Sequence, residues 1–112
     1  MEGCLFCGIV AGDVDAEVVH VTERTVAFRD VNPQAPTHVL VVPRDHYANA
    51  ADLAAGDPTA SAELVTAAAA VAAAEGQDDY RLVLNTGAGA GQSVFHTHLH
   101  LLAGRPFTWP PG

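Results

Sequence analysis

The chain contains the stretch His96-Thr-His-Leu-His-Leu-Leu102, in which histidine occupies every second position at its start. Residues i, i+2 and i+4 of a β-strand lie on one face of the strand. The stretch therefore predicts a strand with three histidines on one side and Thr97, Leu99 and Leu101 facing the core. A helix would spread the same histidines over more than half of its circumference, so the strand is the better interpretation.

Three histidines on one face can simply belong to a solvated strand that has no chemical role. If they have a role, there are two possible uses. All three imidazoles can ligate zinc. Alternatively, one imidazole can attack phosphorus while its neighbours orient it and bind oxygen atoms.

The preceding loop, Asn85-Thr-Gly-Ala-Gly-Ala-Gly-Gln-Ser93, favours the attack on phosphorus. Glycine leaves room for backbone amides to approach an anion closely. The loop is not a Walker loop, because no Gly-Lys-Ser/Thr is present, and no helix follows it as in a dinucleotide fingerprint. Gly91, Gln92 and Ser93 come directly before the histidines. Polar donors and imidazoles therefore converge, as phosphoryl or nucleotidyl transfer requires.

The rest of the sequence predicts an α+β fold with an antiparallel five-stranded sheet and one long helix. The expected strands are two within Val18–Arg29, joined by a turn at Thr22–Thr25, followed by His38–Pro43, Tyr80–Asn85 and Val94–Leu102. The strand His38–Pro43 is rich in β-branched residues, and we expect it to be buried on both faces.

The long helix is expected to begin at the cap Asp57, with Pro58 in its first position, and to run to about Glu75 before Gly76. Its core face is weakly apolar and is expected to contain Leu64, Val65 and Val71 among alanines.

Size and charge exclude several classes of protein. A chain of 112 residues, of which 49% are hydrophobic, can form one compact domain. Its net charge is −8 and all five basic residues are arginines, which disfavours binding along a nucleic-acid backbone but allows binding of a single nucleotide. The longest apolar run, Ala67–Ala74, is far shorter than the roughly 20 residues that a membrane helix needs. No secretory signal is recognisable, so the cytoplasm is the expected compartment.

The only two cysteines, Cys4 and Cys7, form a C-x-x-C pair. A disulfide between such near neighbours closes a tiny loop and stabilises little. In a reducing compartment, paired cysteines more often bind a metal or take part in redox chemistry. Two buried free thiols are the alternative, and a redox motif is disfavoured because no β-α-β pattern surrounds the pair.

Residues 91–102, Gly-Gln-Ser-Val-Phe-His-Thr-His-Leu-His-Leu-Leu, resemble the signature of the histidine triad (HIT) superfamily. The resemblance extends over most of the chain through Cys4–Ile9, Ala27–Asp30, Pro33–His38, Val42–His46 and Trp109–Gly112. It is nearest to the histidine triad nucleotide-binding proteins, which are purine nucleoside phosphoramidases. Thr97 departs from the family, which usually has an apolar residue there, and we expect an effect on packing only. The resemblance implies a single HIT domain over residues 1–112, with a C-terminal tail at 103–112.

The resemblance implies a nucleotide-binding hydrolase that cleaves the P–N bond of purine nucleoside phosphoramidates through a covalent nucleotidyl-histidine. His98 would attack phosphorus, His100 would bind phosphate oxygens, and Ser93 would contact the leaving group or a phosphate oxygen. His38 and His96 would complete the histidine cluster, and no catalytic cofactor is expected. A dinucleoside polyphosphate hydrolase and a nucleotide-binding regulatory module with low turnover are the alternatives.

The implied nucleotide site extends beyond the triad. Asp30 would bind the ribose diol, because a carboxylate can accept from two hydroxyls, although the residues alone favour a turn-forming role. The base would lie between apolar walls that are also core candidates, namely Leu5, Phe6, Ile9, Phe28 and Val31. Further contacts would come from Asn85, Gly91, Gln92 and Trp109, alongside Ser93, His98 and His100.

The resemblance also implies a metal and a partner. Many bacterial relatives bind zinc with such cysteines and two histidines, which here implies the set Cys4, Cys7, His46 and His96. A closed site of two thiolates and two imidazoles is structural. The implied assembly is a homodimer whose sheet continues across both subunits, with Trp109 near the partner's active site. A purine nucleotide is the expected ligand, and neither nucleic acid nor a membrane is an expected partner.

Overall fold

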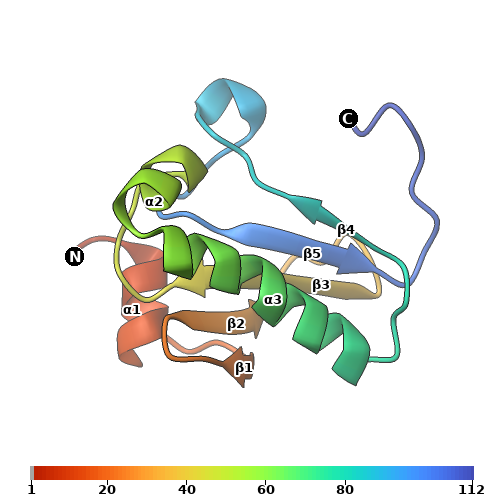
Figure 1. Cartoon of the computed structure of the whole chain (residues 1–112), viewed down its shortest axis with the longest axis horizontal. Coiled ribbons are helices and arrows are strands. Elements are labelled where there is room, and N and C mark those ends of the chain that lie inside the picture. The colour runs from red at the N-terminus through yellow and green to blue at the C-terminus, as the bar shows by residue number, and fades with distance from the viewer. Residues whose placement is uncertain (1) are drawn as a thin grey trace.

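A computed structural model describes residues 2–112, which form one five-stranded sheet and three α-helices (Figure 1). The strands are β1 (Val18–Val21), β2 (Thr25–Arg29), β3 (Thr37–Pro43), β4 (Tyr80–Val83) and β5 (Leu99–Ala103). The helices are α1 (Leu5–Ala11), α2 (Ala50–Gly56) and α3 (Pro58–Ala74), and a 3-10 turn, η1, spans Ala88–Ala90. The predicted α+β class is confirmed. No helix within the described range is long and apolar enough to cross a membrane.

The sheet has the strand order β1-β2-β3-β5-β4, and every neighbouring pair is antiparallel. The central strand β3 is buried over its whole length, as the sequence predicts. Its side chains alternate between the two faces. Val39 and Val41 pack with residues of α3, whereas Leu40 and Val42 cluster with Phe6 of α1. Thus α3 covers one face of the sheet, and α1 lies on the other (Figure 1).

Helix α3 begins and ends as its sequence predicts. Asp57 is the N-cap, and its carboxylate accepts a hydrogen bond from the backbone N–H of Ala60 at 3.0 Å. Pro58 occupies the first helical position, where a missing N–H has no cost. Just beyond the helix, Gly76 has a φ of 70°, a left-handed conformation that glycine adopts without strain.

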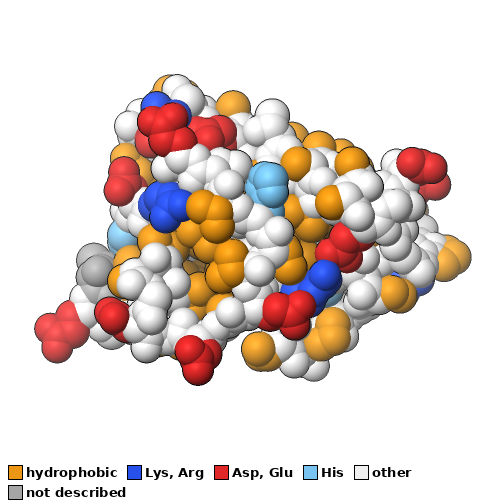
Figure 2. Space-filling model, turned by 90° about the horizontal axis from the view of Figure 1, so that it is seen from below, with side chains coloured by type: hydrophobic (Ala, Val, Ile, Leu, Met, Phe, Trp, Pro, Cys, Tyr) orange, Lys and Arg blue, Asp and Glu red, His pale blue; other side chains and the backbone are white. Residues whose placement is uncertain are grey.

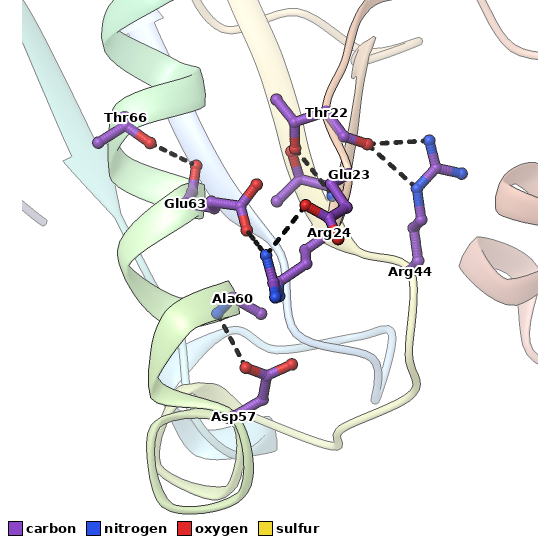
Figure 3. A network of polar contacts seen from close by, with 9 residues as sticks. Thr22, Glu23, Arg24, Arg44, Asp57, Ala60, Glu63 and Thr66 are labelled. Carbon is purple, nitrogen blue, oxygen red and sulfur yellow. Dashed lines mark hydrogen bonds and ion pairs between the residues drawn. The ribbon is translucent and has the colours of Figure 1, made fainter.

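A polar network ties the β1–β2 turn to α3 (Figure 3). The guanidinium of Arg24 donates to Glu63 of α3 at 3.1 Å. The backbone carbonyl of Thr22 accepts from Nε and Nη2 of Arg44 at 3.2 and 3.0 Å. The first contact fixes the hairpin to α3, and the second fixes it to the residue that follows β3.

The strand predicted over Val94–Leu102 is too long, because β5 begins only at Leu99. Ahead of it, the backbone N–H of Thr97 donates to the carbonyl of Tyr47 at 2.7 Å and does not pair with β3. The predicted core residues are nevertheless buried: Thr97, Leu99 and Leu101 are all at most 2% exposed. Burial itself does not alternate, because His96 and His98 are also buried, with their rings against Phe6. The segment before Leu99 therefore keeps the predicted sidedness without being part of the ladder.

Other local predictions also need correction. Strand β4 ends at Val83 and does not reach Asn85. Val65 is 48% exposed and so lies outside the core face of α3, where the sequence placed it with Leu64. The short helices α1 and α2 were not expected at all, and α1 contributes directly to the site described below.

Candidate active site

A cavity of about 430 Å³ lies between α1, the sheet and the histidine segment. Nine of the residues that were predicted to form the nucleotide site line this cavity, namely Leu5, Phe6, Ile9, Phe28, Asp30, Val31, Ser93, His98 and His100. Figure 2 views the molecule from the side of α1 and β1, where hydrophobic side chains gather in a hollow. The lining combines an apolar wall with two imidazoles, a hydroxyl, the carboxylates of Asp15 and Asp30 and the guanidinium of Arg29. Small-molecule sites have this composition, with few polar groups set in an apolar cavity.

The backbone holds His98 in one tautomer. Its Nδ1–H donates to the carbonyl oxygen of His96 at 2.8 Å. Because a carbonyl cannot donate, the proton lies on Nδ1, and the neutral ring keeps a lone pair on Nε2. The residue is only 8% exposed, and its ring stands edge-on against that of Phe6 with ring centroids 5.0 Å apart. His98 therefore has the form that a nucleophile toward phosphorus needs.

His38 and His100 form a hydrogen-bonded pair beside His98. Nδ1 of His38 accepts from the backbone N–H of Gln34 at 3.0 Å, so the proton of His38 lies on Nε2. That Nε2–H donates to Nδ1 of His100 at 2.9 Å, which leaves His100 with its own N–H on Nε2. Asp30 supports the pair, with Oδ2 at 3.4 Å from Nε2 of His38, while its Oδ1 accepts from the backbone N–H of Asn32 at 2.9 Å.

Burial keeps this pair uncharged near pH 7. It lowers the pKa of His100 to about 4, and the neighbouring rings of His98 and His38 add to the effect. Burial also lowers the pKa of His38, although the carboxylate of Asp30 opposes the change. His100 can therefore donate from Nε2 as a neutral imidazole whose orientation His38 fixes.

A second group of histidines meets both cysteines. The Nε2–H of His96 donates to the carbonyl of Pro43 at 2.9 Å, so its Nδ1 carries a lone pair. That Nδ1 lies 3.4 Å from Sγ of Cys4, 3.4 Å from Sγ of Cys7 and 3.2 Å from Nδ1 of His46. Sγ of Cys7 is also 3.4 Å from Nδ1 of His46, and all four atoms lie within 4.8 Å of one another. We call these four residues the Cys/His cluster.

The Cys/His cluster fits a tetrahedral zinc site. Zn–S bonds of about 2.3 Å and Zn–N bonds of about 2.0–2.1 Å place two ligand nitrogens about 3.3 Å apart and a nitrogen and a sulfur about 3.5 Å apart. The observed separations are 3.2 Å between nitrogens and 3.4 Å between sulfur and nitrogen. Burial lowers the pKa of His96 and so favours the neutral ring, which is the form that ligates a metal.

Some predicted nucleotide contacts do not line the cavity among residues 2–112. They are Asn85, Gly91, Gln92 and Trp109. The Gln92 amide is engaged by backbone groups, and Trp109 is 83% exposed on the C-terminal tail. Val31 lines the cavity but is almost fully exposed.

Some groups that shape the site had no assigned role in the sequence. Leu40 lines the cavity, and the alternation of a strand places it on the same face as His38, so the pattern could have revealed it. The carbonyls of Pro43 and His96, which fix two tautomers, have no sequence signal because every residue carries a carbonyl.

Known proteins resemble this chain over nearly its whole length. The model of the HIT domain matches residues 11–107. The purine nucleoside phosphoramidase of Escherichia coli K12 is 39% identical over 107 residues, covering 94% of this chain and 90% of that protein. A 14 kDa zinc-binding protein of Zea mays is 41% identical over 111 residues, covering 96% of this chain and 87% of that protein.

Solved structures agree with the fold. A HIT family hydrolase from Legionella pneumophila has a TM-score of 0.92 at 47% identity, covering 98% of this chain and all of that chain. A Zn-bound histidine triad family protein from Mycobacterium smegmatis has a TM-score of 0.83 at 30% identity, covering 98% of this chain and 80% of that chain. The domain match, the shared fold and the alternating histidines, two of which line the cavity, lead to one conclusion: this chain belongs to the HIT domain family.

Proposed function

We propose that this protein is a nucleotide-binding hydrolase that cleaves the P–N bond of purine nucleoside phosphoramidates, with His98 as the nucleophile. The observation that carries the proposal is the 2.8 Å hydrogen bond from Nδ1–H of His98 to the carbonyl of His96, which places the lone pair of the neutral ring on Nε2 in a residue that lines the cavity. The similarity to the phosphoramidase of E. coli supports the substrate class.

The reaction has two displacements at phosphorus. First, the lone pair on Nε2 of His98 attacks phosphorus, and the P–N bond of the substrate breaks. The amine leaves with the bonding electrons and takes up a proton from the Ser93 hydroxyl or from solvent. Water then attacks the phosphorus and loses a proton to the Ser93 oxygen or to solvent, whichever supplied the amine. The bond to Nε2 breaks with its electrons returning to the ring, and the nucleoside monophosphate departs. The Nε2–H of His100 stabilises the phosphate oxygens as charge develops in both steps.

The remaining cavity residues hold the nucleoside. The carboxylate of Asp30 would accept from the ribose hydroxyls through an oxygen that its turn leaves available. Phe6, Ile9 and Phe28 provide an apolar wall against which a base can stack. An apolar wall binds bases without strong selection between them, so the preference for purines rests on the relatives.

We propose that the Cys/His cluster binds zinc as a structural ion. Bound zinc would cross-link α1 to His46 and His96, and four protein ligands leave no position for water. The ligand spacings support this role, as do the zinc-related descriptions of the Z. mays and M. smegmatis proteins. The ring of His96 would then serve the metal, while its carbonyl serves His98.

The homodimer with a sheet shared between subunits also remains a proposal, as does the assignment of residues 1–112 to one HIT domain in the cytoplasm. β4 lies at one edge of the sheet, and the exposed Trp109 belongs to a tail that does not line the cavity of its own chain. Sedimentation velocity at micromolar concentration tests the assembly, and a single species with the mass of one chain contradicts it.

Purified protein incubated with adenosine 5′-phosphoramidate tests the activity. We expect release of AMP and, after a rapid acid-free quench, a peptide containing His98 with the mass of one added nucleotidyl group. Diadenosine tetraphosphate is the comparison substrate, and faster turnover of it identifies a dinucleoside polyphosphate hydrolase. Tight AMP binding without turnover of either substrate identifies a regulatory nucleotide-binding module and refutes the proposed reaction.

A further inference from the structure

Gln92 is a buried polar side chain that the proposed reaction does not use. It stands directly before Ser93, yet it is 3% exposed and does not line the cavity, whereas Ser93 does. Nε2 of Gln92 donates to the carbonyl of Ala48 at 2.7 Å and to the carbonyl of Val94 at 3.1 Å. Its Oε1 accepts from the backbone N–H of Gly87 at 2.9 Å. Both amide hydrogens are therefore engaged, and no side-chain donor is left for a phosphate.

The hydrogen bonds of Gln92 hold the preceding glycine-rich loop in one conformation, which the sequence of that loop does not favour by itself. Residues 87–91 contain three glycines, and Gly87 and Gly91 have φ values of 87° and 99°. Glycine loses the most conformational freedom on folding, so such a loop needs contacts elsewhere to hold one shape. The side chain and the backbone N–H of Gln92 both bind Gly87, the latter through the Gly87 carbonyl at 3.1 Å. Gln92 thus closes the loop immediately before Ser93.

The anchor at Ala48 is itself fixed. The carbonyl of Tyr47 accepts from the backbone N–H of Thr97 at 2.7 Å and from its hydroxyl at 3.0 Å. His46, the preceding residue, belongs to the Cys/His cluster. Three consecutive residues therefore connect that cluster, the histidine segment and the glycine-rich loop. Gln92 supplies the contact to the loop.

We propose that Gln92 is a positioning residue, which sets the place of the Ser93 hydroxyl beside His98 and does not itself touch the nucleotide. This inference rests on the proposed function, in which Ser93 assists departure of the amine. In this arrangement Gln92 holds the glycine-rich loop in place, and Ser93 contacts the substrate.

A double-mutant cycle tests the proposal with adenosine 5′-phosphoramidate as substrate. The variants are Gln92→Met, which keeps the length but loses the amide, Ser93→Ala, and the two combined. Misplacement of a catalytic group by about an ångström can cost on the order of 100-fold in rate, so Gln92→Met is expected to lower kcat by roughly tenfold to 100-fold with little change in KM. In the Ser93→Ala background the same replacement is expected to lower kcat by no more than about twofold, because residues that act as a unit are not additive.

Multiplicative losses in the double variant would overturn the proposal, because they would mean that Gln92 acts independently of Ser93. Gln77→Met is the matched control, since it makes the same replacement at a residue outside the cavity. It is expected to leave kcat unchanged. Thermal unfolding of each variant identifies a loss that is merely structural, which would reduce stability equally with and without Ser93.

Amide hydrogen exchange provides a readout that does not need turnover. Gln92→Met is expected to raise exchange at Gly87 by at least roughly tenfold, and Gln92→Glu, which keeps the acceptor for that N–H, by less. Amides of β5 serve as the internal reference. Unchanged exchange at Gly87 in Gln92→Met overturns the proposal even if the protein proves not to hydrolyse phosphoramidates. Wild-type protein without turnover but with the expected exchange would refute the proposed function and leave the loop contact established.

Discussion

The two groups of histidines in this molecule use the same side chain in opposite ways. His96 gives its Nε2–H to the carbonyl of Pro43 and presents Nδ1 to two thiols and another imidazole. His98, two residues later, gives its Nδ1–H to the carbonyl of His96 and keeps Nε2 for the cavity. The alternation that places the rings on one side does not distinguish these uses. Each ring donates one N–H to a backbone carbonyl, and this hydrogen bond determines which of its two nitrogens keeps a lone pair for chemistry.

Replacing His98 by Ala is the strongest way to break this comparison. Removal of a nucleophile should lower turnover of adenosine 5′-phosphoramidate by at least roughly a thousandfold, because no other group forms the covalent intermediate. AMP binding by calorimetry should change little, since the apolar wall and Asp30 remain. His20→Ala, a histidine outside the cavity, is the control. Retained turnover in the purified His98→Ala protein would show that the two groups do not differ in the way described.

Removing both sulfurs tests the other side of the comparison. Cys4→Ser with Cys7→Ser should reduce bound zinc from one equivalent to none in a metal analysis and lower the unfolding temperature, because the metal links α1 to the sheet. Turnover should fall far less than in His98→Ala, since the carbonyl of His96 stays in place. Zinc that persists in this double variant, but is lost in His100→Gln, would assign the metal to the cavity.

His38 offers a smaller and more selective test. His38→Ala removes the donor to Nδ1 of His100 and should lower kcat by roughly tenfold to 100-fold, less than the loss of a direct oxyanion donor can cost. His38→Gln places an amide N–H near the position of the imidazole Nε2 and should recover part of the rate. Equal rates for both variants would mean that the orientation of His100 does not depend on His38.

The smallest expected effect is on stability as a function of pH. Unfolded histidines bind protons near pH 6.5, whereas the folded pKa of His100 is about 4 and that of His38 is also lowered. The unfolded chain therefore takes up protons first. Their contribution to stability is complete above about pH 6.5 and is lost as the pH falls toward 4.

Urea midpoints measured between pH 7.5 and 4.5 in a chelating buffer should fall with pH. They should fall less steeply in His100→Gln than in wild type. His20→Gln serves as the control, because it changes a histidine outside the cavity. The same slope in all three proteins would contradict the assignment of low proton affinity to the buried pair.

Much of the fold is predictable from local sequence because it rests on local rules. Asp57 and Pro58 start α3, and the alternation around Leu99 gives the buried side even though the ladder begins late. Helices α1 and α2 escape such rules. Each has seven residues, too few for a periodic pattern, and their stability comes from tertiary contacts such as those of Phe6 and Leu53.

The site is less predictable because its partners are distant in the sequence. Cys4 and Cys7 meet His96 across about ninety residues, and no spacing in the chain reveals this. Family resemblance supplied that set and part of the cavity lining, but not residues such as Leu40. Neither residue types nor resemblance gave the tautomers or the engagement of Gln92, since these depend on backbone atoms that all residues share.

The acceptor that orients His98 has a consequence for how sequences in such proteins can diverge. The acceptor is a main-chain oxygen at position 96, and exchanging the side chain there does not delete it. Homologous proteins can thus lose the side chains that bind the metal and still hydrolyse their substrate, provided that packing keeps the backbone at position 96 in place. Metal content and catalytic competence are therefore expected to vary separately among homologous chains.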